Sequence, residues 1–369
     1  MYYKDFQGLK ISALGMGGVR FPTVEGDPNR IDREKAIPLV REAYAQGINF
    51  FDTAYTYQNG DSERFFAEAL APYPRQSYYL STKFYANGKY DIREVFEEQL
   101  KRLQTDYIDF YMLHSLDETR LSYYTDKEKD YLGFLLEQKK AGRIRFLGFS
   151  THASPTQLEE FLNYFHGYDM ALMQLNFVDW TLLEAKQQYE ILTARNIPVW
   201  VMEPLKGGRL VNMNEQAQAI LKAKLPDRSA PSWSFRFLMG LPNVQCVLSC
   251  MAQMPVLEEN LATFRQPDPL TPEEESILMQ AKEAYMKDMG VPCSACRYCC
   301  ATCPSELNIP ELIRIYNEKR ISGSTWRITI PADLKGAENC LQCGICLSYC
   351  PQRIDIPAVM QKLQEEKET

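Results

Sequence analysis

Short apolar runs alternate with stretches of helical periodicity along the first 270 residues. The apolar runs lie near residues 13–17, 49–52, 78–82, 108–113, 145–150, 171–176, 199–203 and 244–249. Between most of them, apolar residues recur at helical spacing, as in 36–46, 93–103, 155–165 and 182–195. The alternation predicts eight strand–helix units. Periodicity alone leaves two folds open, a closed (β/α)8 barrel and a doubly wound open sheet.

The character of the sequence changes near residue 270. The segment 266–272 is rich in proline and indicates the exit from a domain. Thr271, Pro272 and three glutamates then form a typical helix start, with a capping residue, a first-turn proline and an acidic first turn. We expect this helix to span 272–289. The sequence therefore predicts two domains, 1–270 and 271–369.

Cysteines are concentrated in the second predicted domain. Nine of the eleven lie between Cys293 and Cys350, and the other two, Cys246 and Cys250, flank the eighth apolar run, where we expect buried thiols. Two motifs have identical spacing, each ending in proline: Cys293, Cys296, Cys299 and Cys303, then Cys340, Cys343, Cys346 and Cys350. This is the pattern of bacterial two-cluster ferredoxins, in which the fourth cysteine of each motif binds the other cluster.

The pattern predicts two [4Fe–4S] clusters. One would be bound by Cys293, Cys296, Cys299 and Cys350, and the other by Cys340, Cys343, Cys346 and Cys303. A disulfide framework is disfavoured in the cytoplasm, and zinc sites rarely use a duplicated four-cysteine run. Cys300 is interpreted as a thiol that binds no cluster. The alternative is that it replaces one of the predicted ligands. The long segment 304–339 and the helical patterns at 310–319 and 357–368 predict a partly helical ferredoxin-like domain.

Four residues follow the ends of apolar runs in the first domain. Asp52 ends the second run, Tyr57 lies five residues later, and Lys83 and His114 end the third and fourth runs. The ends of parallel barrel strands carry the active site in barrel enzymes. An Asp, Tyr, Lys and His set at these positions is a candidate for acid–base chemistry.

These residues belong to a series of motifs that resembles the aldo-keto reductase family. The series is Asp52-Thr53-Ala54-x-x-Tyr57, Ser81-Thr82-Lys83, Asp109 to His114, Gly148-Phe149-Ser150, Gln174-Leu175-Asn176, Glu203-Pro204-Leu205 and Glu259-Asn260. The motifs occur in the family's order over roughly the first 270 residues. The resemblance favours the barrel over the open sheet, and with the cysteine domain it points to the iron–sulfur-containing bacterial branch of the family.

The resemblance implies a role for each of the four residues. Carbonyl reduction needs a hydride and a proton, and a free tyrosine titrates near 10. Tyr57 would be the general acid, and the Lys83 ammonium would favour its phenolate. Asp52 would orient Lys83, and His114 would position the carbonyl oxygen.

The resemblance also implies a nicotinamide site. Its expected residues are Ser150, Gln174 and Asn176, with His152 as a neighbouring candidate and Glu259 and Asn260 as further family matches. The chain departs from the family at Met202, where a stacking aromatic is usual, and at 249–256, which lacks the basic residues that bind the phosphate of NADP. We therefore expect NAD(H) or NADP(H) as the cofactor, with NAD(H) slightly favoured. Lys206 and Gly207 lie where barrels often bind phosphate, of a dinucleotide or of a flavin, or else they form a solvated glycine-rich turn.

The net charge and the lengths of the apolar runs limit the partners and the location that we expect for the protein. The net charge is −7, which argues against nucleic acid or an anionic membrane as a main partner. The N-terminus has no apolar signal segment, and no apolar run approaches transmembrane length. We expect a cytoplasmic protein.

Three functional interpretations follow. The first is an enzyme that reduces an aldehyde or ketone, or oxidises the alcohol, with a nicotinamide cofactor and two [4Fe–4S] clusters for electron transfer. The second is a flavin- or ferredoxin-linked enzyme whose clusters conduct electrons from a carrier protein. The third is a non-catalytic electron-transfer module. Loops 21–32 and 116–130 are expected to surround the substrate, whose identity the sequence does not specify.

Overall fold

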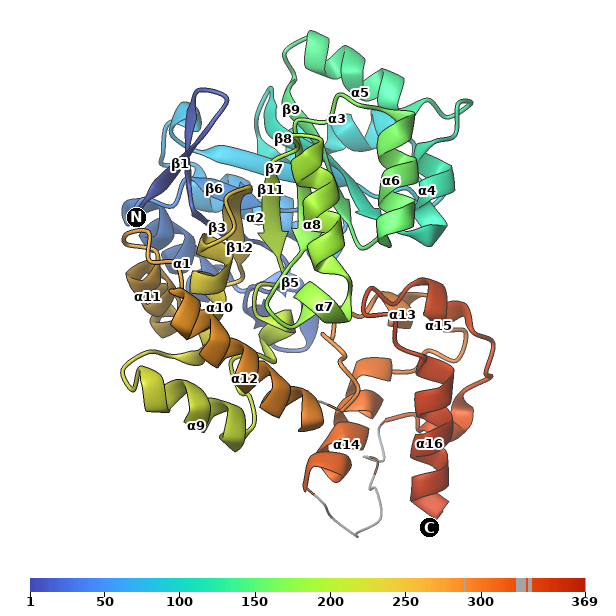
Figure 1. The fold of residues 1–369 in the computed structure, drawn as a ribbon. Coiled ribbons are helices and arrows are strands. Elements are labelled where there is room, and N and C mark those ends of the chain that lie inside the picture. The colour runs from blue at the N-terminus through green and yellow to red at the C-terminus, as the bar shows by residue number, and fades with distance from the viewer. Residues whose placement is uncertain (289, 323–329, 331–333, 369) are drawn as a thin grey trace. The chain divides into compact units, whose positions relative to one another are not determined.

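The structure is a computed structural model that describes residues 1–288, 290–322, 330 and 334–368 (Figure 1). It divides into two compact units. The first contains residues 1–204 and 231–270, and the second contains residues 205–230 and 271–369. The expected domain boundary after residue 270 stays a prediction. The structure groups the additional segment 205–230 with the C-terminal part of the chain.

Eight parallel strands form a closed barrel in the first unit. In chain order they are β3 (Leu14–Gly17), β6 (Phe50–Asp52), β7 (Tyr79–Phe84), β8 (Ile108–Leu116), β9 (Ile144–Thr151), β10 (Met170–Gln174), β11 (Val199–Met202) and β12 (Val244–Ser249). The last strand pairs with the first through Val247 and Leu14, so the sheet has no free edge. This closure confirms the predicted (β/α)8 barrel and excludes the open sheet.

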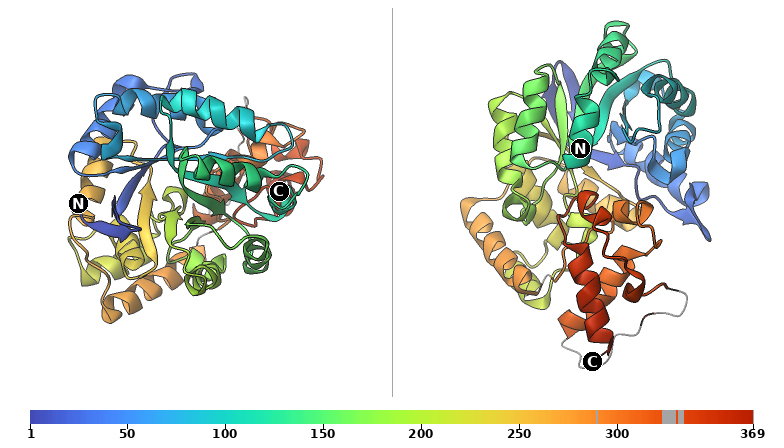
Figure 2. Two further views of the ribbon diagram at one scale, coloured as in Figure 1. Left: turned by 90° about the horizontal axis from the view of Figure 1, so that it is seen from above. Right: turned by 90° about the vertical axis from the view of Figure 1, so that its right-hand side faces the viewer.

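Helices follow most of the strands, and Figure 2 shows them from two further sides. They are α1 (Arg33–Ala45), α2 (Asp61–Leu70), α3 (Ile92–Leu103), α4 (Glu118–Tyr124), α5 (Tyr131–Lys140), α6 (Pro155–Tyr164), α7 (Asp179–Leu182), α8 (Ala185–Ala194), α10 (Ala230–Met239) and α11 (Met254–Thr263). Side chains fix where several begin. Asp32 caps α1 and Asp91 caps α3, while Ser154 and Gln157 form a capping box at α6.

The structure differs from the sequence-based expectation in three places. The helix expected at 182–195 corresponds to α8, but it begins only at Ala185, because Glu184 before it adopts a left-handed backbone conformation with φ of 55°. The expected loop 21–32 contains a small hairpin, β4 (Thr23–Val24) and β5 (Asp27–Ile31). The expected loop 116–130 contains α4.

An N-terminal hairpin packs against the interior of the barrel. Its strands are β1 (Tyr3–Phe6) and β2 (Leu9–Ser12). Phe6 contacts barrel aromatics, with ring centroids 4.9 Å from Phe146 and 5.0 Å from Trp200. These side chains and Phe110 belong to one buried apolar cluster. A barrel filled in this way is a solid core, so its chemistry is confined to the strand ends.

The second unit is built from helices and connecting segments in its described residues. The helices are α9 (Glu215–Lys224), α12 (Pro272–Asp288), α13 (Tyr298–Ala301), α14 (Ile309–Ser322), α15 (Ile345–Ser348) and α16 (Ile356–Glu368), with short 3-10 turns at η3 (Lys206–Gly208) and η4 (Ala337–Asn339). The expected helix 272–289 matches α12, although Met289 lies outside the described residues. Helices α14 and α16 lie beside each other and share an apolar core that contains Leu312, Tyr316 and Met360.

Within the described part of the chain, every helix is too short or too polar to cross a lipid bilayer.

We expect Phe110→Ala to destabilise the barrel strongly. The Phe110 ring is fully buried and lies 5.0 Å from both Phe50 and Phe146, so truncation leaves a cavity among rigid neighbours. The expected loss is about 3–5 kcal/mol in the free energy of unfolding, measured by urea denaturation. Leu136→Ala, at an exposed position on α5, is the control. Equal effects of the two changes would contradict the packing argument.

Candidate active site and cysteine sites

Strand register brings three of the four predicted catalytic residues to neighbouring strand ends. Asp52 ends β6, Lys83 lies near the end of β7, and His114 lies near the end of β8. Asp52 pairs with Ser81 on β7, and Lys83 pairs with Met112 on β8. Because the strands are parallel, these side chains gather at the C-terminal edge of the barrel.

Asp52 and Lys83 form a buried ion pair. The Lys83 Nζ lies 2.7 Å from both carboxylate oxygens of Asp52 and donates a third hydrogen bond, of 2.6 Å, to the Thr53 carbonyl. Ser81 donates its hydroxyl to Asp52 Oδ1 at 2.8 Å. The three hydrogen bonds match the three donors of an ammonium group. The geometry therefore fits a charged lysine.

Burial and pairing act on this ion pair in opposite directions. Desolvation lowers the pKa of Lys83 and raises the pKa of Asp52, because it disfavours both charges. Their mutual attraction and hydrogen bonding oppose both shifts, and the hydrogen bond from Ser81 also opposes the shift in the pKa of Asp52. The side chains are only 1% and 5% exposed, so neither charge is stable at this position without the other.

Tyr57 lies next to Lys83 and His114. It begins the short turn η1 (Tyr57–Gly60), where the next two residues, Gln58 and Asn59, have left-handed backbone conformations. Lys83 Nζ is 5.1 Å from the centroid of the Tyr57 ring. The His114 ring centroid is 5.7 Å away, with the two rings at 77°. All four predicted catalytic residues are therefore brought together.

The His114 imidazole is held in its neutral form. Burial lowers its pKa well below the ordinary range, and the charges of Lys83 and Arg120 lower it further. Its Nδ1 is buried and has no hydrogen-bond partner among the described residues. A neutral ring with an unused nitrogen is suited to bind a substrate oxygen or a hydroxyl group.

A polar network behind β7 supports Lys83, and no motif in the sequence indicates it. Glu63 on α2 is fully buried and accepts hydrogen bonds from Thr82 at 2.7 Å and from Gln99 at 2.8 Å. Gln99 also donates to the Lys83 carbonyl, and Arg102 pairs with Glu63 at 3.2 Å. The network fixes the backbone that carries Lys83.

The predicted nicotinamide residues lie on β9 and β10 and in the segments that follow them. Ser150 is buried, and its hydroxyl accepts a hydrogen bond from the Ser115 amide at 2.7 Å. Gln174 and Asn176 both donate their side-chain amides to Asp179, at 2.8 and 2.6 Å. Asp179 is therefore the residue that orients both amides, and no motif in the sequence pointed to it.

His152 lies near this group of polar residues. Burial, followed by the charge of Arg120, lowers its pKa from 6.5 to about 4, and a hydrogen bond with Gln174 opposes the shift. Arg120 on α4 is itself buried and pairs with Asp117 and the Tyr85 hydroxyl. The i,i+3 spacing of Asp117 and Arg120 is the only sequence signal for this buried cation.

The other predicted cofactor residues are dispersed. Asn260 on α11 is buried and donates to the Ser249 hydroxyl at 3.1 Å, whereas the neighbouring Glu259 is exposed. Lys206 and Gly207 belong to the second unit, where Lys206 donates to Gln352. Their proposed contact with a cofactor phosphate stays a prediction.

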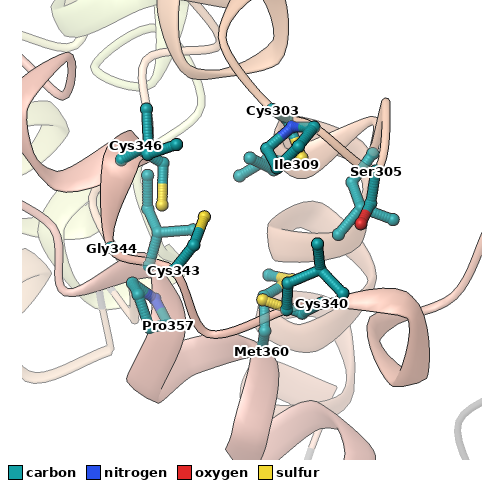
Figure 3. A pocket seen from close by; sticks show the side chains of 14 residues that line it. Cys303, Ser305, Ile309, Cys340, Cys343, Gly344, Cys346, Pro357 and Met360 are labelled. Carbon is teal, nitrogen blue, oxygen red and sulfur yellow. The ribbon is translucent and has the colours of Figure 1, made fainter.

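Four cysteines surround one recess in the second unit. Cys303, Cys340, Cys343 and Cys346 line about 370 Å³ of open space, together with apolar residues such as Met360 (Figure 3). Burial, followed by the neighbouring thiols of Cys340, Cys343 and Cys303, raises the pKa of Cys346 to about 11. Thiols grouped in this way ionise readily only if a cationic centre binds them.

The remaining predicted ligands form a second group. Burial raises the pKa of Cys293, with a contribution from Cys350, and the pKa of Cys299 is raised by Cys300, Cys296 and Cys350. Cys300 shares a hydrogen bond with Cys299. None of the eleven cysteines, all of which lie within the described residues, is in a disulfide. The neighbouring thiols are compatible with the two sets that the spacing predicts, and the binding of two clusters by these sets stays a prediction.

We expect Asp52→Asn to destabilise the protein, because it leaves the Lys83 charge buried without its partner. The expected loss is about 3–5 kcal/mol in the free energy of unfolding. Adding Lys83→Met to the Asp52→Asn variant should recover much of that loss. Asp5→Asn removes a partner of Lys10 from an ion pair whose side chains are 69% and 74% exposed, and should have little effect. Urea denaturation of the wild type and these three variants tests the pair.

We also expect His152 to make the fold sensitive to acid. Its pKa in the folded protein, about 4, lies below the ordinary 6.5, so the unfolded chain binds more protons between these values. Stability is therefore lost as the pH falls through this window. Between pH 7 and pH 5, His152→Asn should lose about 2 kcal/mol less stability than the wild type. The exposed His166→Asn is the control and should follow the wild-type curve.

Comparison with known proteins identifies both parts of the chain. Residues 13–283 match the aldo/keto reductase family, and residues 292–354 match a 4Fe-4S dicluster domain. L-Galactose dehydrogenase of Arabidopsis thaliana is 25% identical over 305 residues, which are 73% of this chain and 89% of the relative. The NADH-specific methylglyoxal reductase of Escherichia coli is 29% identical over 226 residues, or 55% of this chain and 64% of the relative.

A solved structure supports the same fold. An aldo-keto reductase from Bacillus halodurans is similar to this chain with a TM-score of 0.63 and 24% identity, over 76% of this chain and 96% of that one. The chain spans less than two thirds of the length of several other curated relatives. The family match covers well over half of the chain, so this chain belongs to the aldo/keto reductase family and is an oxidoreductase with a C-terminal 4Fe-4S dicluster domain.

Proposed function

We propose that the enzyme interconverts a small carbonyl compound and its alcohol with a nicotinamide cofactor, using Tyr57 as the general acid and base. The observation that carries this proposal is the buried Lys83–Asp52 pair beside the Tyr57 ring. A fixed ammonium 5.1 Å from the ring centroid stabilises a phenolate. A tyrosine whose phenolate is stabilised in this way can both donate and accept a proton, as a reductase requires.

Each residue has a defined part in the proposed reaction. The bound nicotinamide would supply the hydride to the carbonyl carbon. The Tyr57 hydroxyl donates its proton to the carbonyl oxygen, which completes the alcohol, and solvent returns a proton to the phenolate. Lys83 stabilises that phenolate, and Asp52 keeps Lys83 in place. His114, as a neutral ring with an unused Nδ1, holds the substrate oxygen.

The nicotinamide carboxamide is expected to contact Ser150, Gln174 and Asn176. Asp179 supports this assignment because it fixes both side-chain amides in place. The segment 249–256 has no basic side chain for the additional phosphate of NADP, which favours NAD(H). The name of one relative, an NADH-specific methylglyoxal reductase, agrees with this preference.

The two cysteine sets are proposed to bind two [4Fe–4S] clusters. Cys293, Cys296, Cys299 and Cys350 would hold one cluster, and the set that lines the recess would hold the other. The clusters would supply one-electron transfer. Met202, at the end of β11, supports a second candidate function, because it leaves no stacking aromatic there. In that alternative, a flavin or a carrier protein delivers electrons.

We expect Tyr57→Phe to abolish carbonyl reduction and to leave the iron–sulfur spectrum unchanged. Anaerobically purified protein is mixed with NADH and methylglyoxal, and nicotinamide absorbance and cluster absorbance are followed together. The loss of the proton donor should lower kcat by at least about 100-fold. Tyr55→Phe is the matched control, because the Tyr55 ring stacks on Arg102 and has no part in the proposed reaction.

Other outcomes of this experiment separate the alternatives. If the Tyr57→Phe variant turns over at the wild-type rate, Tyr57 is not the proton donor. If NADH is not consumed with any carbonyl but a reduced carrier protein bleaches the clusters, the carrier-linked alternative replaces the nicotinamide proposal. If electrons pass between clusters and carrier with no substrate converted, the protein is an electron-transfer module.

A further inference from the structure

A short loop in the second unit contacts both chain segments that carry the ligands of one proposed cluster. The loop comprises residues Lys206–Arg209 and includes the turn η3. It follows strand β11 in the chain after only three intervening residues. We call it the 206–209 loop. The segment that follows β11 therefore contacts the cysteine-containing part of the second unit, to which it belongs.

Hydrogen bonds join both ends of the loop to this cluster site. Lys206 Nζ donates to Gln352 Oε1 at 2.8 Å, and Gln352 lies two residues after Cys350. Arg209 donates to the Val291 carbonyl at 3.0 Å and to the Cys293 carbonyl at 3.4 Å. The two cations thus reach the two segments that the cluster itself would join.

Gly207 permits this close approach. It has a left-handed φ of 66°, and a Cβ added to it would lie 2.6 Å from the Ser294 carbonyl oxygen. Ser294 lies between Cys293 and Cys296. Any side chain at residue 207 would push the loop away from the segment that carries these ligands.

The two proposed cluster sites differ in the charged side chains that lie beside them. Lys206 is fully buried, so its ammonium acts in a medium of low dielectric. By contrast, the residues that line the recess of Cys303, Cys340, Cys343 and Cys346 include no charged side chain in the part of the chain that the structure describes. Lys335 contacts the Ser305 carbonyl beside that recess, but it is 55% exposed and paired with Glu306.

We propose that the 206–209 loop raises the reduction potential of the cluster held by Cys293, Cys296, Cys299 and Cys350 above that of the other cluster. This inference rests on the proposed cluster ligands. A cluster with four thiolates is anionic, and each electron it accepts adds one negative charge. A buried ammonium and a guanidinium beside it stabilise that added charge. Electrons that enter the cysteine domain therefore collect at this cluster.

The test is a redox titration of the full-length protein under anaerobic conditions. Dithionite is the reductant, and the two reduced clusters are followed by low-temperature electron paramagnetic resonance. Lys206→Gln removes the charge and keeps an amide that is able to bond with Gln352. We expect the higher of two midpoint potentials to fall by at least about 59 mV, a tenfold loss of electron affinity, while the lower one stays constant.

Three further variants separate charge from structure. Arg209→Gln should move the same midpoint in the same direction, and Lys206→Arg, which keeps the charge, should leave it near the wild-type value. The matched control is Lys222→Gln, because Lys222 is an exposed lysine on α9 of the same unit. It should move neither midpoint. Iron and sulfide content is measured in every preparation.

Several outcomes would overturn the proposal. It fails if Lys206→Gln protein with full iron content shows two unchanged midpoints, or two midpoints that shift equally. It also fails if Lys206→Gln protein assembles no cluster whereas Lys206→Arg protein does, because the loop is then needed for assembly rather than for the potential. A wild-type protein that shows no iron–sulfur signal after reconstitution would instead refute the proposed cluster ligands.

Discussion

The chemistry proposed for this enzyme depends on a buried ion pair, Lys83 and Asp52. Desolvation opposes both charges, and an isolated ammonium at this position would lose its proton. The fold compensates with a complete set of acceptors for Lys83 and a hydroxyl donor from Ser81 for Asp52. The barrel therefore holds a positive charge beside Tyr57 that solvent does not screen. That charge is what distinguishes Tyr57 from an ordinary tyrosine.

The pair in turn depends on the register of β6, β7 and β8. A shift of one residue would turn Lys83 away from the barrel interior, because side chains alternate along a strand. The Glu63 network opposes such a shift by binding Thr82 and the Lys83 carbonyl from the helix side. The buried carboxylate of Glu63 thus helps to position the buried ammonium of Lys83. The active-site geometry and the stability of this side of the barrel cannot be varied independently.

Sequence reasoning was most effective where function depends on local spacing. The strand ends at Asp52, Lys83 and His114 were predictable because each polar residue interrupts an apolar run, and the cysteine sets were predictable because their spacing repeats. The Glu63 network was not, since its partners come from distant elements. Asp179 was not either, although its partners Gln174 and Asn176 are close in the chain, because no motif marks its orienting role. Lys206 is the clearest example of a contact that the sequence does not reveal. Its partner Gln352 is 146 residues away in the chain, so only the folded structure reveals that contact.

In the proposed function, the barrel and the cysteine domain would transfer different numbers of electrons at a time, and the proposed difference in potential bears on that mismatch. A nicotinamide gives two electrons together as a hydride, whereas each cluster accepts one. Two clusters together have the capacity for both electrons of one hydride. If their potentials were equal, the first electron would distribute over both. The cations of Lys206 and Arg209, beside one proposed cluster site, would instead give the two electrons a fixed order of arrival. The same asymmetry arises whether a flavin or a carrier protein exchanges electrons with the clusters, because it is set by charges within the cysteine domain.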